Sequence, residues 1–301
     1  MTMQARTVAS MIATALTNEE VLTKLGVASV VLLGAGHEAQ VYAMSDSRVA
    51  RIMRPGSTLA EAEARAALLR EIADSAATLS FHTPVMRSVE LIGDRVVVIE
   101  RLMPGEPVSA LLKRLSGPAR EKLLADYLDM ATNIQRLRVT RPYFGPLIGD
   151  RASRFSRWSD YARAHAATSI GRCPPDLRLA VAAEAGRTWE EPVRPALVHL
   201  DYFAPNVLTE SGAVTAVLDF GSSTIIGDPR MEAWSAVAYL DAEITPEAHD
   251  EDRALAMAWL ARQGLADGYP QARRWLAASW SFAVDDAALM AWCRKVLLGS
   301  D

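Results

Sequence analysis

Residues 199–221 read His-Leu-Asp-Tyr-Phe-Ala-Pro-Asn-Val-Leu-Thr-Glu-Ser-Gly-Ala-Val-Thr-Ala-Val-Leu-Asp-Phe-Gly. The rest of the chain is interpreted from this stretch. Two short β-prone runs, 206–208 and 214–218, flank a polar turn that contains a glycine. Runs of this kind on either side of such a turn predict a β-hairpin. A hairpin of this length returns Asp219 close to Asn206.

The residue types in this stretch are those that phosphoryl transfer from a nucleotide requires. The reaction needs oxygen ligands for Mg²⁺ and a carboxylate that accepts or orients the proton of the attacking hydroxyl. We therefore expect Asn206 and Asp219 to bind the metal. Asp201 would act as the base, and His199 would brace the loop from behind by hydrogen bonds. The alternative is a set of ordinary turn residues, but five specified residues at two fixed gaps argue against it.

The composition of the chain allows a large folded core, since 50% of its 301 residues are hydrophobic and 23% are charged. This length is enough for two packed lobes. A net charge of −4 without a basic run argues against nucleic acid as a partner. The N-terminal segment lacks the apolar core of a signal peptide, and no apolar run approaches the roughly 18 residues of a membrane helix. Cys173 and Cys293 fit neither a disulfide framework nor a metal-ligand spacing. We expect a soluble, cytoplasmic protein without a membrane partner.

A strand, a Gly-Ala-Gly turn and a second strand form a candidate site for nucleotide phosphates. The run 30–33 leads into Gly34 and Gly36, and glycine lets backbone amides approach a phosphate closely. A plain hairpin with a flexible turn is the alternative. In the next strand Arg51 is the expected cation for the α- and β-phosphates, with Arg54 as the second candidate. The alternative for Arg51 is a solvated arginine at a sheet edge.

A helix predicted from residue 59 to about 73 carries glutamates, one of which should pair with the phosphate-binding cation. Glu61 and Arg65 share a helix face at i, i+4, whereas Glu63 lies far around the helix from Arg65. We therefore favour Glu61 over Glu63 as the partner of the cation. Most other charges on this helix form its solvated side.

The continuous apolar run 96–99 predicts a strand buried in the sheet. It leads into Arg101-Leu102-Met103-Pro104-Gly105, whose composition is typical of a linker between lobes. Backbone groups beside such a linker are available to an adenine edge. We expect the carbonyl of Arg101 and the amide of Met103 to make these contacts.

The remainder of the chain is predicted to be mostly helical, beginning with a helix from residue 117 to about 137. Asp228 is expected to cap a helix that runs from 231 to 240. The segment 241–252 is rich in acids. It would either attract a polycationic substrate or form the start of a solvated helix, because acids favour a helix N-terminus.

These motifs resemble those of the aminoglycoside phosphotransferase and choline kinase-like superfamily. The pattern H-x-D-x-x-x-x-N followed by D-F-G occurs without the long activation segment and A-P-E motif of protein kinases. The resemblance implies an α+β, bilobal protein kinase-like fold. Residues 1–103 would form a small lobe around an antiparallel sheet, and residues 104–301 a mostly helical lobe. Asp201 matches the family's catalytic base, and Asn206 and Asp219 match its metal ligands.

Three departures from the family pattern concern mainly the grip on the nucleotide. Arginine replaces the expected lysine at position 51, and Arg65 stands where the family's helix glutamate would align. The helix that ends near Leu137 also lacks the Leu-His often seen there. The first two departures motivate one alternative hypothesis, a nucleotide-binding pseudokinase without turnover.

The function that these patterns favour is Mg²⁺-dependent transfer of the γ-phosphate of ATP or GTP to a hydroxyl of a small molecule. An aminoglycoside-like antibiotic is the first acceptor to consider. A second alternative is a kinase of another small metabolite, such as an amino alcohol or a sugar amine. The sequence identifies neither the acceptor nor the nucleotide base.

Overall fold

The computed structural model describes residues 16–36, 38–44 and 47–299, and the chain divides into two compact units. The first unit consists of residues 1–63 and 86–102, and the second consists of residues 64–85 and 103–301. The domain assignment made from the sequence, with a boundary at residue 103, stays a prediction. The structure differs from it in two respects, because residues 64–85 and Met103 belong to the second unit.

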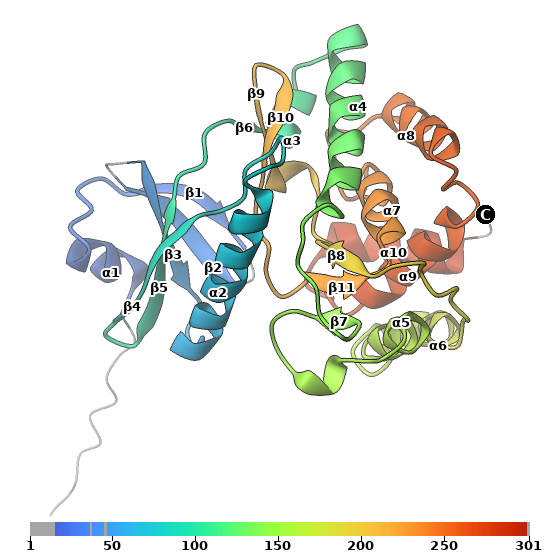
Figure 1. The fold of residues 1–301 in the computed structure, drawn as a ribbon, viewed down its shortest axis with the longest axis horizontal. Coiled ribbons are helices and arrows are strands. Elements are labelled where there is room, and N and C mark those ends of the chain that lie inside the picture. The colour runs from blue at the N-terminus through green and yellow to red at the C-terminus, as the bar shows by residue number, and fades with distance from the viewer. Residues whose placement is uncertain (1–15, 37, 45–46, 300–301) are drawn as a thin grey trace, which may run out of the picture. The chain divides into compact units, whose positions relative to one another are not determined.

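The first unit is built on an antiparallel sheet, blue to teal in Figure 1. Within its described residues the strand order is β1-β2-β3-β5-β4. The strands are β1 (Val31–Ala35), β2 (Ala39–Ala43), β3 (Arg48–Met53), β4 (Met86–Ile92) and β5 (Arg95–Arg101). Residues 96–99 of β5 are all buried, so the prediction of a strand buried in the sheet is confirmed.

One short helix, α1 (Asn18–Lys24), packs on this sheet. Thr17 and Glu20 form a capping box at its N-terminus, which satisfies backbone N–H groups that have no partner inside the helix. Its apolar residues Val21 and Leu22 join a core cluster that includes Ile52 of β3. The first unit thus has a small hydrophobic core on the α1 side of the sheet.

The second unit is mostly helical. The helix α2 (Leu59–Ala76) starts in the first unit and belongs to the second from residue 64 onward. The later helices are α3 (Val108–Leu112), α4 (Gly117–Ile134), α5 (Trp158–Ala167), α6 (Arg178–Ala185), α7 (Arg230–Ala238), α8 (Asp250–Arg262), α9 (Tyr269–Trp280) and α10 (Ala287–Leu298). Short 3-10 turns lie at Arg151–Ser153, Pro175–Leu177 and Ala204–Asn206. None of the helices within the described residues has the length and apolarity needed to span a membrane.

Two small antiparallel sheets hold the loops of the second unit. One sheet has the order β10-β9-β6, and the other has the order β7-β11-β8. Their strands are β6 (Glu106–Pro107), β7 (Gly145–Pro146), β8 (Ala196–Val198), β9 (Val207–Glu210), β10 (Ala213–Val217) and β11 (Ile225–Gly227). The loop that contains Asp201 leaves β8 and enters β9. The segment from Asp219 to Gly221 leaves β10 and enters β11.

Aromatic side chains fill the core of the helical part of this unit. Trp158 of α5 lies within about 6 Å of the rings of both Trp189 and Trp275. The helices α5 and α6 lie side by side beneath β7 and β11 in the view of Figure 1. The α+β class predicted from the sequence, a small antiparallel sheet with a mostly helical remainder, matches this arrangement.

Candidate active site

The hairpin predicted from residues 206–218 is confirmed, and it brings Asp219 to Asn206. Strands β9 and β10 pair antiparallel, with Val207 opposite Val217. Immediately beyond this pair, the N–H of Leu218 donates to the carbonyl of Asn206 over 2.8 Å. Asp219 therefore follows a residue that is hydrogen-bonded to Asn206.

Asp201 and Asn206 contact each other across the turn that joins β8 to β9. The side-chain N–H₂ of Asn206 donates to the backbone carbonyl of Asp201 over 3.0 Å and to its carboxylate over 3.3 Å. With its nitrogen committed to Asp201, Asn206 keeps its amide oxygen as an acceptor. The structure thus brings together the three residues that the sequence assigned to the base and the metal ligands.

His199 links this loop to the end of the hairpin. It is fully buried, its Nδ1 accepts from the N–H of Asp201 over 3.1 Å, and its Nε2 lies 2.8 Å from the carbonyl of Leu218. Since Nδ1 is the acceptor, Nε2 carries the proton and donates to that carbonyl. Burial lowers the pKa of the imidazole to about 4, so the ring is neutral at physiological pH. This geometry agrees with the predicted bracing role.

Two non-glycine residues of the site have left-handed backbone conformations. The φ angle of Leu200 is +60° and that of Asp219 is +62°. This region costs an L-residue about 1–2 kcal/mol, so it persists only where surrounding contacts hold it. The chain therefore changes direction at Leu200, just after β8, and again at Asp219, just after β10.

The helix α7 supplies the contacts that hold Leu200. The fully buried carboxyl of Glu232 accepts from the N–H of His199 and, at 3.4 Å, from the N–H of Leu200. In the next peptide group, the hydroxyl of Tyr239, which directly follows α7, donates to the carbonyl of Leu200. Burial raises the pKa of Glu232 to about 8, and the nearby charge of Asp201 adds to this effect. Glu232 is not among the site residues predicted from the sequence, although an acid inside an otherwise apolar helix is a usable signal.

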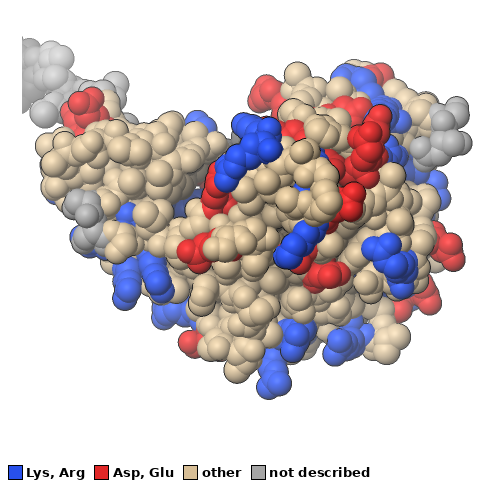
Figure 2. All heavy atoms as spheres, turned by 90° about the horizontal axis from the view of Figure 1, so that it is seen from above, with Lys and Arg blue, Asp and Glu red and all other residues tan. Residues whose placement is uncertain are grey.

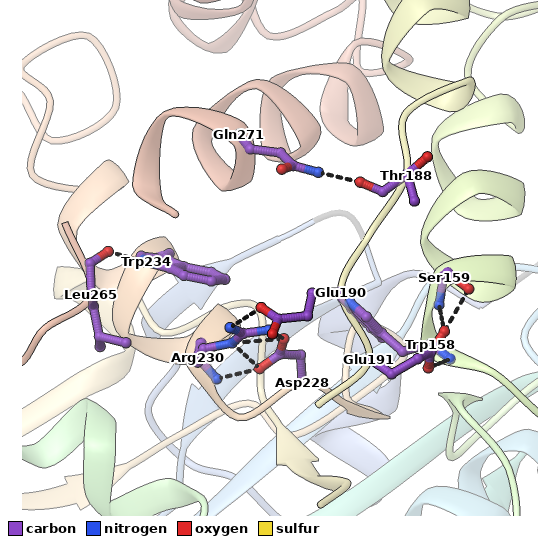
Figure 3. A network of polar contacts seen from close by, with 10 residues as sticks. All are labelled: Trp158, Ser159, Thr188, Glu190, Glu191, Asp228, Arg230, Trp234, Leu265 and Gln271. Carbon is purple, nitrogen blue, oxygen red and sulfur yellow. Dashed lines mark hydrogen bonds and ion pairs between the residues drawn. The ribbon is translucent and has the colours of Figure 1, made fainter. Parts of the chain in front are cut away.

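The start of α7 is itself fixed by a polar network, shown in Figure 3. The buried carboxylate of Asp228 accepts from the N–H of Arg230 over 2.9 Å and pairs with its guanidinium over 2.7 Å. Asp228, predicted to cap this helix, thus binds the first N–H of α7. Glu190 approaches the same guanidinium at 3.2 Å. In the same view Glu191 accepts from the backbone of Trp158 at the start of α5.

Arg65 of α2 contacts Asp219, which the sequence analysis did not foresee. The two residues lie in the same unit, and Nη2 of Arg65 is 2.5 Å from Oδ1 of Asp219. The arginine side chain is only 6% exposed, whereas the aspartate side chain is 34% exposed. From the sequence, Arg65 is expected to share a helix face with Glu61 and stands at the place of a family glutamate, but no contact with Asp219 is predicted. Its contact spans 154 positions of the chain, and no local pattern reports such a contact.

The predicted phosphate-binding turn lies in the first unit. The N–H of Gly36 donates to the carbonyl of Ala39 over 2.9 Å, and Arg54 donates to the carbonyl of Gly36 over 3.0 Å. A Cβ atom placed on Gly34 would meet no atom within 4 Å. Packing inside the protein therefore does not require glycine at position 34. The absence of a side chain there leaves room for a ligand to approach the backbone closely.

The predicted pairing of Arg51 with Glu61 is wrong. Nε of Arg51 lies 3.2 Å from the buried carboxylate of Glu100, on the neighbouring strand β5. Glu61 instead accepts from the backbone and hydroxyl of Thr58 over 2.9 and 2.8 Å, which lowers its pKa. A glutamate three residues after a threonine completes a capping box, and this local contact holds Glu61 at the helix N-terminus.

The two backbone positions predicted to bind an adenine edge lie in different units. Arg101 is the exposed last residue of β5 in the first unit. The side chain of Met103 is buried in the second unit, where it packs with Leu208 and Ala216. Their contact with a base stays a prediction.

The acidic segment 241–252 is largely ion-paired within the second unit. Its pairs are Asp241 with Arg253 and Arg273, Glu243 with Lys295, Glu247 with Lys113, and Asp252 with Arg120. On the face drawn in Figure 2, Lys and Arg side chains likewise lie among Asp and Glu. Since α8 begins at residue 250, the segment fits the interpretation as a helix start better than an open patch for a polycation.

The site suits a metal ion that takes most of its ligands from elsewhere. Among the described residues no group of three or more His, Cys, Asp and Glu side chains is placed to hold a metal ion by itself. Asn206 and Asp219 offer oxygen ligands on adjacent backbone, and Mg²⁺ binds by one or two such ligands together with water and substrate phosphates. The residues present therefore fit the ion that the sequence predicted.

Comparisons with known proteins agree with this geometry. A family model described as a phosphotransferase enzyme family, APH, matches residues 29–276. A comparison with curated protein sequences found no match. The protein kinase-like fold predicted from the sequence is confirmed by similar solved structures.

Three of these solved structures illustrate the similarity. A thermostable mutant of aminoglycoside phosphotransferase APH(4)-Ia is 20% identical with a TM-score of 0.67, covering 94% of this chain and 98% of the other. ADP-bound aminoglycoside phosphotransferase APH(2'')-Ib is 13% identical with a TM-score of 0.61, covering 94% and 96%. Macrolide 2'-phosphotransferase MphH from Brachybacterium faecium is 17% identical with a TM-score of 0.56, covering 94% and 98%.

Proposed function

The chain belongs to the phosphotransferase enzyme family, and from this premise we propose that it transfers the γ-phosphate of ATP or GTP to a hydroxyl of a small molecule. Mg²⁺ would be the cofactor. The observation that carries the proposal is the convergence of Asp201, Asn206 and Asp219. Two hydrogen bonds join Asn206 to Asp201, and a backbone hydrogen bond joins Asn206 to the residue before Asp219.

Each of these residues has a role that follows from its chemistry. Asp201 orients the acceptor hydroxyl and takes its proton as the oxygen–phosphorus bond forms and the bond to the leaving nucleoside diphosphate breaks. Asn206 holds the carboxylate of Asp201 through its N–H₂ group, and its amide oxygen and the carboxylate of Asp219 would hold Mg²⁺. When bound, the ion supplies positive charge that neutralises the phosphate oxygens.

The nucleotide contacts remain part of the proposal. Gly34 and Gly36 are the candidates for covering the phosphates with backbone amides, and Arg51 is the candidate cation. Arg101 and Met103 are the candidates for the adenine edge. The use of a nucleotide is supported by relatives of known structure, one bound to ADP and another of the APH(2'') type solved with GDP and kanamycin.

The acceptor is proposed as an aminoglycoside-like or macrolide-like antibiotic. This choice is supported by similar solved structures, which include a complex with streptomycin and ATP, one with gentamicin, and two macrolide 2'-phosphotransferases. A kinase of another amino alcohol or sugar amine is the alternative. A cytoplasmic location, where nucleoside triphosphates are available, completes the proposal.

The test compares the wild type with Asp201→Asn and with Asp126→Asn, a control on the solvated side of α4. Release of nucleoside diphosphate is measured with Mg²⁺ over a panel of hydroxyl compounds, and nucleotide affinity is measured with a fluorescent ATP analogue. Loss of the base should lower kcat by roughly 10²- to 10⁴-fold, while the nucleotide Kd stays within about twofold of the wild-type value because Asp201 faces the acceptor.

Two outcomes would contradict the proposal. Undiminished turnover by Asp201→Asn would refute the assignment of the base. Nucleotide binding without turnover on any acceptor would favour the pseudokinase hypothesis instead.

A further inference from the structure

Arg65 is a positive charge built into the group of residues proposed to bind the metal. It lies on α2 and is held by its helix, whose neighbouring residues Leu68, Leu69 and Ile72 are buried in the core. The guanidinium is almost completely removed from solvent, and it hydrogen-bonds Asp219 over 2.5 Å. Burial of a charge is costly unless an opposite charge pairs with it. Arg65 and Asp219 therefore stabilise each other in the metal-free protein.

The same contact places Arg65 in competition with a metal ion. Nη2 of Arg65 lies 2.5 Å from Oδ1 of Asp219, so a Mg²⁺ held by Asp219 would share this carboxylate with the guanidinium. The ion and the guanidinium would then be close neighbours of like charge. The side chain of Asp219 remains 34% exposed, so an ion from solvent can reach it, but it meets the charge of Arg65 there.

Nucleotide phosphates would change this balance. A Mg²⁺ at Asp219 takes phosphate oxygens as further ligands, which brings negative charge within reach of Arg65. The guanidinium is a planar fork of donors that suits phosphate as well as carboxylate. Arg65 could then exchange part of its contact with Asp219 for a phosphate oxygen, and its repulsion of the ion would be relieved.

We propose that Arg65 couples the binding of the divalent ion to the binding of the nucleotide: it holds Asp219 in the metal-free protein and pairs with phosphate when both ligands are present. The metal ion alone then binds weakly, and Arg65 increases the affinity for the nucleotide alone. Each ligand increases the affinity of the protein for the other. This inference rests on the proposed function, since it takes Asp219 as a metal ligand and a nucleotide phosphate as the second partner.

The experiment measures binding without turnover. Mn²⁺ serves as the paramagnetic probe of the metal site, and its affinity is measured by electron paramagnetic resonance with and without a non-hydrolysable ATP analogue. The affinity for the same analogue is measured with and without EDTA. The proteins are the wild type, Arg65→Gln, Arg65→Lys and Arg70→Gln. Arg70 is the matched control because it lies on the same helix but is exposed.

The wild type should bind Mn²⁺ about tenfold or more tightly when the nucleotide analogue is present, a coupling of ordinary size. In Arg65→Gln the affinity for Mn²⁺ alone should rise about tenfold, because a like charge beside the ligand is removed. Its affinity for the metal-free analogue should fall about fivefold, because one charge-assisted contact to phosphate is lost. Arg65→Lys should stay closer to the wild type in both measurements, and Arg70→Gln should match it.

Unchanged or weaker binding of Mn²⁺ by a folded Arg65→Gln protein overturns the inference. If that variant does not fold, equal Mn²⁺ affinity of the wild type with and without the analogue overturns it equally well. Neither result depends on catalysis. The proposed function fails separately, if Asp201→Asn retains full turnover or if no acceptor is phosphorylated.

Discussion

Glu232 offers the sharpest test of how α7 supports the loop that contains Asp201. The perturbation is Glu232→Gln, which keeps an oxygen to accept from the N–H groups of His199 and Leu200 but removes the ionisable proton. The carboxyl is fully buried, and Oε1 has no hydrogen-bond partner within the described residues. A neutral amide is therefore a close substitute for the protonated acid.

The magnitude follows from the pKa of this carboxyl. Burial raises it to about 8 in the folded protein, against an ordinary value of 4.5 in the unfolded chain. Between these pH values the folded state keeps a proton that the unfolded state releases, so stability falls as the pH rises. The loss is about 1.4 kcal/mol per pH unit and at most about 5 kcal/mol over the whole interval. Above pH 8 both states are ionised and the dependence ends.

The assay is urea denaturation of the wild type, Glu232→Gln and the exposed control Glu121→Gln at pH values from 5.5 to 8.5. Titrations shared by the proteins cancel in the comparison. Relative to the wild type, the free energy of unfolding of Glu232→Gln should increase by about 1.4 kcal/mol per pH unit up to pH 8. A difference between these two proteins that is the same at every pH would refute the reasoning, because Glu232 would then ionise like an ordinary glutamate.

Two further predictions concern stability in the second unit. Burial between Tyr161 and Trp275, with ring centroids 5.3 Å from each, lowers the pKa of His165 to about 4. The free energy of unfolding should therefore fall as the pH falls from 6.5 toward 4, by about 1–2 kcal/mol between pH 7 and 5. In urea denaturation His165→Phe should lose less stability than the wild type over this range. An equal loss in the two proteins would contradict this prediction. Gly145 has a φ of +130°, and a Cβ there would lie 2.4 Å from the carbonyl oxygen of Ser153, so Gly145→Ala should cost about 2–4 kcal/mol in thermal unfolding. Gly149→Ala, with a positive φ but no atom within 4 Å, should cost less, and equal costs would show that the clash is not responsible.

The features that the sequence predicted correctly depend on local pattern. The hairpin from 206 to 218 follows from two β-prone runs around a turn, and the approach of Asp219 to Asn206 follows from the hairpin. The fold could be predicted because the resemblance, strongest in one short motif, extends over most of the chain. Local pattern also explains the error at Glu61, since the Thr58-x-x-Glu61 capping box was itself readable in the sequence.

The features that the sequence did not predict depend on contacts between distant segments. Glu232 contacts the backbone of His199 across 33 positions, and Arg51 reaches Glu100 across 49. Periodicity along one helix or strand carries no information about which residue of another element lies opposite. The first pair depends on the packing of α7 against the loop of His199, and the second on the register of β3 with β5. Only the structure shows these two arrangements.

Contacts within the second unit hold the loop of Asp201 and the turn at Asp219 in place. Leu200 and Asp219 are both left-handed, at a cost of about 1–2 kcal/mol each. His199 joins the loop to the end of the hairpin by hydrogen bonds to Asp201 and Leu218. Glu232 holds the loop by accepting from the N–H groups of His199 and Leu200. The charge of Asp219 is balanced in a different way, because its carboxylate pairs with the side chain of Arg65. If the proposed exchange occurs, the site keeps its shape while its ion pairs change. Arginine on α2 is then compatible with phosphoryl transfer, provided that phosphate takes over from Asp219 as its partner.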